Sequence, residues 1–251
     1  MITNLSIGKY GRFANMLFQI AAVVGIARKS SQDYGFLPPY NHDHKERFGS
    51  TEECDLEKMF VNSFPRLLQG VQFAPRAYSW GYHDIFLPAG HWDISGHFQS
   101  DKYFLHCLPE VRQLLTLKCE PDEYLPQVAI HVRRGDYDNV YHPRIGREYY
   151  DRARGQFPAE TQFLVFSDDI QEARQMLGDD HTTYREGAPY YWDFAVMKKC
   201  SGFITANSSF SLMAAILSDA PGKKVICPRT WFGPAWTPTT ADLYPRNSIV
   251  L

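Results

Sequence analysis

The residues with the most chemical potential lie in the stretch HVRRGDY, from His131 to Tyr137, directly after the apolar run Val128 to Ile130. A guanidinium group makes paired hydrogen bonds to a phosphate or a carboxylate, and a glycine lets a ligand approach the backbone closely. Two interpretations follow. The charged groups either pair with one another as a structural ion-pair knot, or they form a site for an anionic ligand.

Three more polar clusters follow apolar runs: GKYGRFAN at 8–15, SDD at 167–169 and ANSSFS at 206–211. In an open parallel sheet, ligands bind outside the carboxyl ends of the strands. The cluster at 206–211 precedes a predicted helix, whose free N–H groups favour a phosphate, although plain N-capping also explains its serines. Asp169 and Glu172 have the spacing of a capping box, so Asp168 is the better ligand candidate in its cluster.

The strands and helices that position these clusters alternate along the second half of the chain. Apolar runs predict strands at 128–132, 163–167, 202–207 and 223–228, and helices at 147–157, 168–177, 190–200 and 208–218. This βαβα rhythm predicts a parallel sheet covered on both faces. The first half predicts a less regular α/β unit, with a strand at 2–7, a helix at 16–29 and a helix at 105–118. A linker is expected at 119–127, which gives domains at 1–122 and 123–251.

The net charge, the cysteine spacing and the lengths of the apolar runs restrict the class of protein. The 251 residues carry a formal net charge of −2, so no basic field exists for nucleic acid. The five cysteines form no CxxC pair, and no zinc, P-loop or dinucleotide motif appears, so no metal or cofactor is expected. The longest apolar run, at 20–27, is too short for a membrane span, and no signal-peptide pattern precedes it, which predicts a cytoplasmic protein. The polar segment 38–53 is expected to be a loop in which His42 and His44 are solvated.

The clusters, in their order, resemble the α1,2-fucosyltransferases of glycosyltransferase family 11, which are inverting enzymes that use GDP-fucose. The matching segments are GKYGRFANMLFQ, HVRRGDY, FSDD and CSGFITANSSFS. Together they extend the resemblance over about residues 5 to 233. The GRFAN form is reminiscent of the related protein O-fucosyltransferases.

This resemblance implies a GT-B-like fold, in which two Rossmann-like domains face a cleft. Domain 1–122 would contact the acceptor, and domain 123–251 would bind the GDP-sugar. The implied reaction is the metal-independent transfer of L-fucose to a glycan hydroxyl, with the 2-hydroxyl of galactose as the expected acceptor. An inactive nucleotide-sugar or glycan-binding module and a transferase that uses another nucleotide sugar are the alternatives. The oligomeric state stays open.

The resemblance also assigns roles to particular residues. Arg133 is expected to meet the departing phosphate while Arg134 supports the loop, because alternation along a strand sends neighbouring side chains to opposite faces. The catalytic candidates are Arg133, Asn15 and Asp136, where Asp136 is a candidate base. The donor-binding candidates are Arg12, His131, Arg133, Arg134, Asp168, Asn207, Ser208, Ser209 and Phe210. The aromatic side chains of Tyr78, Trp80, Tyr82 and Trp92 either stack on acceptor sugars or fill the core of the first domain.

Overall fold

The computed structural model describes residues 1–9, 11–37, 56–137, 140–178 and 180–251, and the predicted loop at 38–53 lies outside this range. The chain divides into two compact units. The first comprises Met1–Lys118 and Ala241–Leu243, and the second comprises Cys119–Thr240 and Tyr244–Leu251. The boundary between these units therefore falls four residues before the predicted one at 122. The GT-B arrangement of the two units stays a prediction.

The first unit contains a three-stranded parallel sheet with the order β1-β3-β2. Its strands are β1 (Ile2–Thr3), β2 (Ala74–Ala77) and β3 (Trp92–Ser95). Its helices are α1 (Phe13–Lys29), α3 (Leu56–Met59), α4 (Leu108–Leu114) and the 3₁₀ turns η1 (Asp101–Tyr103) and η2 (Leu105–Cys107). The long helix α1 packs so closely on η1 that a Cβ atom at Gly25 would lie 2.0 Å from the carbonyl oxygen of Tyr103.

Two predicted elements of the first unit are shorter than expected. The strand predicted at 2–7 ends at Thr3, because the Asn4 side chain accepts a hydrogen bond from the Ser6 N–H (2.8 Å) and turns the chain. The helix predicted at 105–118 is confirmed only from Leu108 to Leu114. The predicted first turn, Leu105–Cys107, is the separate 3₁₀ turn η2. Pro109 lies in the first turn of α4, where its missing N–H has no helical partner to lose.

The second unit contains six parallel strands in the order β6-β5-β4-β7-β8-β9. They are β4 (Leu125–Val132), β5 (Phe163–Ser167), β6 (Thr182–Tyr184), β7 (Cys200–Ile204), β8 (Val225–Cys227) and β9 (Ile249–Val250). This is the 3-2-1-4-5-6 order of a dinucleotide-binding sheet, with its switch point between β4 and β7. The predicted parallel sheet is confirmed, while β6 and β9, which lie at its two edges, were not predicted.

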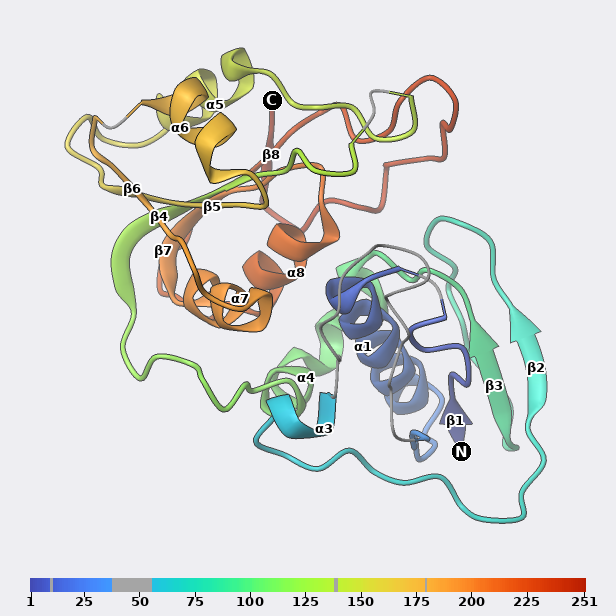
Figure 1. The fold of residues 1–251 in the computed structure, drawn as a ribbon. Helices are drawn as coiled ribbons and strands as arrows, with labels where there is room; N and C mark the ends of the chain where they lie inside the picture. Colours follow the sequence, from blue (N-terminus) through green and yellow to red (C-terminus); the bar gives the residue numbers. More distant parts are fainter. Residues whose placement is uncertain (10, 38–55, 138–139, 179) are drawn as a thin grey trace. The chain divides into compact units, whose positions relative to one another are not determined.

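Four helices cover the two faces of this sheet: α5 (Arg147–Arg154), α6 (Ile170–Leu177), α7 (Tyr190–Lys198) and α8 (Ser209–Leu217). Figure 1 shows α5 and α6 on one face and α7 and α8 on the other. Val128, Ile130 and Val132 point from β4 into the core beneath α5 and α6, whereas His131 points toward α8. No helix in the described ranges has the length and apolar character that a membrane crossing requires.

Candidate active site

Arg133 follows the central strand β4, and its guanidinium group lies between two carboxylates. Its Nη2 donates to Asp136 Oδ1 at 2.5 Å, and its Nη1 lies 3.0 Å from Asp168 Oδ2. The guanidinium carbon lies 5.6 Å from the centre of the Tyr137 ring. The Arg133 side chain is 17% exposed, so it is held on several sides and still reaches the surface. A partly exposed, preorganised cation at a strand end can bind an anion.

Arg134 is buried on the opposite side of the strand, as alternation predicts. Its Nη1 donates to the carbonyl oxygen of Ile145 at 3.0 Å, and its Nη2 lies 2.7 Å from Met176 Sδ on α6. Its Nε is 3.0 Å from Glu172 Oε1, in the geometry of an ion pair rather than of an aligned hydrogen bond. With 5% of the residue exposed, Arg134 joins the loop after β4 to α6.

Asp168 connects the end of β5 to the loop after β4. Its Oδ1 accepts a hydrogen bond from the backbone N–H of Arg134 at 2.8 Å, while Oδ2 faces Arg133. Asp169 is the N-cap of α6, and its side chain accepts a hydrogen bond from the Glu172 N–H at 2.9 Å. This confirms the first of the two hydrogen bonds of the predicted capping box. The Glu172 carboxylate instead pairs with Arg134.

His131 is a buried, neutral histidine. Ser211 Oγ donates to the Ser208 carbonyl oxygen (3.4 Å) and lies 3.0 Å from His131 Nδ1. This arrangement favours the tautomer in which Nδ1–H donates to Ser211. Burial, together with the smaller effect of the nearby charge of Arg133, lowers the pKa of His131 to about 3. The Phe210 ring packs beside it, with ring centres 5.5 Å apart.

Asn207 lies in the loop after β7 and connects this loop to those after β4 and β8. Its Nδ2 donates to the carbonyl oxygens of Pro143 (2.9 Å) and Trp231 (3.2 Å). The hydroxyl of Tyr137 donates to the Asn207 carbonyl oxygen at 2.8 Å. Asn207 is 2% exposed, so its side chain holds the loops after β4 and β8 at the switch point.

The start of α8 lies next to this junction. Ser208 is the N-cap of the helix and accepts from the Phe210 N–H at 3.3 Å, which matches the plain capping interpretation of this serine. Ser209 and Phe210 are half-buried in its first turn. His131, Phe210 and Ser208 are thereby brought together, with Ser211 as the link that the sequence did not single out.

Arg12 and Asn15 belong to the first unit. Asn15 Oδ1 accepts a hydrogen bond from Gln99 Nε2 at 2.7 Å, and Arg12 is the N-cap residue of α1 without a side-chain capping bond. Gly11 has a φ of 81°, and a Cβ atom there would lie 2.0 Å from the Asn15 amide nitrogen, which explains the glycine at this turn. Contact of Arg12 or Asn15 with the donor stays a prediction.

The four aromatic residues considered for acceptor stacking are half-buried and already contact other side chains of the first unit. Trp80 lies 4.9 Å from the His97 ring centre, and Tyr82 lies 4.9 Å from Tyr103. Arg76 lies over Trp92 at 4.9 Å. These contacts favour the packing interpretation, and stacking on an acceptor sugar stays a prediction.

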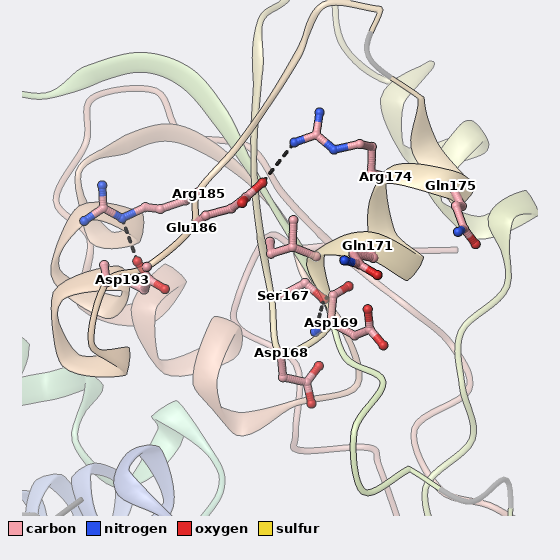
Figure 2. Close-up of a pocket in the computed structure, with 12 residues that line it drawn as sticks. Ser167, Asp168, Asp169, Gln171, Arg174, Gln175, Arg185, Glu186 and Asp193 are labelled. Atoms are coloured by element: carbon pink, nitrogen blue, oxygen red, sulfur yellow. Dashed lines mark hydrogen bonds and ion pairs between the residues drawn. The ribbon is translucent and has the colours of Figure 1, made fainter.

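A pocket of about 760 Å³ lies beside Asp168 (Figure 2). Its lining residues come from the end of β5, from α6, from the segment between β6 and α7 and from the first turn of α7: Ser167, Asp168, Asp169, Ile170, Gln171, Arg174, Gln175, Arg185, Glu186, Gly187, Ala188 and Asp193. Arg185 Nε donates to Asp193 Oδ1 at 2.6 Å, and Arg174 pairs with Glu186 at 3.0 Å. Burial raises the pKa of Asp193, against the opposing effect of Arg185.

Sequence reasoning missed most of this pocket wall. Arg185 and Asp193 carry no recognisable motif, and only the fold brings them to Asp168. Glu172 was visible as a capping-box residue, but its ion pair with Arg134 depends on the packing of α6 against the loop after β4. Across the described residues, His, Cys, Asp and Glu side chains form no group of three or more that could hold a metal ion.

An all-parallel sheet in this order gives the second unit a Rossmann-like fold, and Arg133 lies at its switch point. Residues 79–236 match the family model of Glycosyl transferase family 11. The chain belongs to this family and is a glycosyltransferase.

Individual relatives agree with this family. An O-antigen biosynthesis glycosyltransferase, WbnK of Escherichia coli, is 31% identical over 116 residues, which cover 41% of this chain and 38% of the relative. Galactoside alpha-(1,2)-fucosyltransferase 2 of Hylobates lar is 24% identical over an alignment of 289 residues that covers 96% of this chain and 80% of the relative. The enzyme of the same name from Bos taurus is 23% identical over 292 residues, with the same coverage.

Proposed function

We propose that this chain transfers L-fucose from GDP-fucose to a hydroxyl group of a glycan, with inversion and without a metal ion. The 2-hydroxyl of galactose is the first acceptor to test. Family membership and the names of the relatives support the fucosyl transfer. The observation that carries the donor assignment is Arg133, a partly exposed guanidinium preorganised at the end of the central strand. A module that binds only glycans would need no such cation at a switch point.

Arg133 supplies the main electrostatic contribution to the proposed reaction. The bond between the fucose anomeric carbon and the β-phosphate oxygen breaks, and the acceptor oxygen forms the new bond on the opposite face. Negative charge grows on the departing GDP, and a fixed guanidinium stabilises that charge more than it stabilises the bound substrate. The acceptor proton passes to a base, for which Asp136 is the candidate, or to water. Asp136 also pairs with Arg133, so it has an orienting role before any proton transfer.

The nucleoside end of the donor is proposed to enter the pocket beside Asp168. This pocket borders the carboxylate that contacts Arg133, so a phosphate at Arg133 and a nucleoside in the pocket would be contiguous. Its wall presents carboxylates, amides and guanidinium groups, which can serve the donors and acceptors of a base and a ribose. The acceptor glycan would be the second substrate.

A transfer assay tests the proposal directly. The protein is incubated with GDP-fucose and lactose in EDTA, and the product is examined by NMR for its linkage and anomeric configuration. An α-linked fucose on the galactose 2-hydroxyl is expected, because inversion of a β-linked donor yields an α product. UDP-galactose and GDP-mannose serve as competing donors. Transfer from one of these but not from GDP-fucose, or activity that is lost in EDTA, would contradict the proposal.

A further inference from the structure

We propose that Asp168 is a positioning residue for Arg133: its carboxylate holds the guanidinium in the orientation that meets the β-phosphate of the donor. This inference rests on the proposed function. It gives Asp168 a role that acts through another side chain, whereas the sequence predicted only a donor contact.

The two oxygens of Asp168 have separate partners in one loop. Oδ1 accepts from the backbone N–H of Arg134 at 2.8 Å, and Oδ2 lies 3.0 Å from Arg133 Nη1. The first contact fixes the carboxylate relative to the backbone, and the second transfers that orientation to the guanidinium. Asp136, the other partner of Arg133, lies in the same loop, and 45% of its side chain is exposed. Asp168 is therefore the contact that ties Arg133 to the neighbouring strand β5.

Gly135 makes room for this carboxylate. A Cβ atom at position 135 would lie 2.4 Å from Asp168 Oδ2, which is closer than unbonded atoms approach. The other near atom is Asp168 Cγ, at 3.4 Å from that Cβ position, so the steric restriction comes from this one side chain. An alanine would displace the oxygen that orients Arg133. The glycine in HVRRGDY is thus explained by the position of Asp168.

A direct contact between Asp168 and the nucleoside is the competing explanation, because Asp168 also lines the pocket. The positioning role and the nucleoside contact have different effects on the affinities for GDP and GMP, which share a nucleoside and an α-phosphate. A nucleoside contact contributes equally to both affinities. A residue that orients Arg133 toward the β-phosphate contributes to GDP binding alone. The ratio of GDP affinity to GMP affinity therefore isolates the positioning role.

The experiment measures both affinities by isothermal titration for the wild type, Arg133→Ala, Asp168→Asn and Gly135→Ala. Asp168→Asn keeps an acceptor for the Arg134 N–H but turns an amide group toward Arg133. Gly135→Ala displaces Asp168 Oδ2 but leaves the carboxylate intact. If Asp168→Asn fails to fold, Gly135→Ala alone provides the comparison. Asp151→Asn is the matched control, since Asp151 forms an exposed ion pair with Arg147 on α5.

The wild type should prefer GDP over GMP by about tenfold or more, the value of a charge-assisted hydrogen bond. Asp168→Asn and Gly135→Ala should lose this preference to the level of Arg133→Ala, and Asp151→Asn should keep it. In the Arg133→Ala background, Asp168→Asn should change the ratio no further. A preference that survives in both Asp168→Asn and Gly135→Ala would overturn the inference alone. A wild type without GDP binding, or an Arg133→Ala variant with the full preference, would overturn the proposed function and the inference with it.

Discussion

Arg133 and Arg134 are adjacent in the sequence, yet their guanidinium groups engage carboxylates from different segments. Arg133 pairs with Asp136 and Asp168 and remains partly exposed. Arg134 is buried and pairs with Glu172 of α6. Substitutions at the two positions should therefore have different effects. Replacing Arg133 should reduce catalysis, and replacing Arg134 should reduce the stability of the fold.

Arg133→Lys should lower kcat/KM for the donor by about a hundredfold or more while the fold stays intact. A lysine keeps the charge, but its ammonium group lacks the planar fork that reaches Asp136, Asp168 and a phosphate together. The loss of one preorganised donor to a developing anion costs about 3 kcal/mol of transition-state stabilisation. Steady-state kinetics with GDP-fucose measure this effect, and an unchanged kcat/KM would argue against a catalytic role for Arg133.

Arg134→Met should lower the free energy of unfolding by about 1–3 kcal/mol, because the Ile145 carbonyl loses its donor and Glu172 loses its buried partner. Urea denaturation followed by circular dichroism measures the change. Arg147→Met is the control: Arg147 forms an exposed pair with Asp151, so its loss should cost no more than about 0.5 kcal/mol. Equal effects at the two positions would contradict the structural role of Arg134.

His131 should make the protein less stable in mild acid. Its pKa is about 3 when folded, against about 6.5 in the unfolded chain, so below pH 6.5 the unfolded state takes up a proton that the folded state does not. Stability falls as pH falls through this window, and the loss amounts to about 2 kcal/mol at pH 5.

His131→Asn removes this titration and offers an amide in place of Nδ1. The stability difference between the wild type and the variant should therefore shrink by about 2 kcal/mol between pH 7.5 and pH 5. Urea unfolding at the two pH values measures it. A difference that does not vary with pH would show that His131 titrates normally in the folded protein.

Asn207→Ala should destabilise the protein by about 1–3 kcal/mol, because two loop carbonyl oxygens lose their donor. GDP affinity should fall less than in Arg133→Ala, since the Asn207 side chain is engaged by the loops. Thermal unfolding and GDP titration on the same sample separate the two effects. A large loss of GDP affinity with unchanged stability would instead support the predicted direct contact with the donor.

The sequence predicted the parallel sheet of the second unit and the clusters at its strand ends, because buried parallel strands appear as short apolar runs between helices. It did not reveal β6 and β9, since these strands have only three and two residues and no apolar run of useful length. The first unit was harder to predict, because its strands are short and a local hydrogen bond ends β1 at Thr3.

The candidate site shows a similar division. The arginines, Asp168 and the serines before α8 carry their chemistry in their residue types and positions. Their partners are long-range: Arg134 meets Glu172, His131 meets Ser211, and Gly135 faces Asp168. No local pattern encodes these pairs, because each depends on how two separate elements pack.

The central claim is that Arg133 holds the pyrophosphate of a guanine nucleotide, and calorimetric titration with GDP in EDTA tests it most directly. The wild type and the surface control Arg147→Ala should bind GDP with similar affinity, and Arg133→Ala should bind at least about tenfold more weakly. If GDP fails to bind the wild type, or binds Arg133→Ala equally well, the site at the end of β4 is an ion-pair knot and not the donor site.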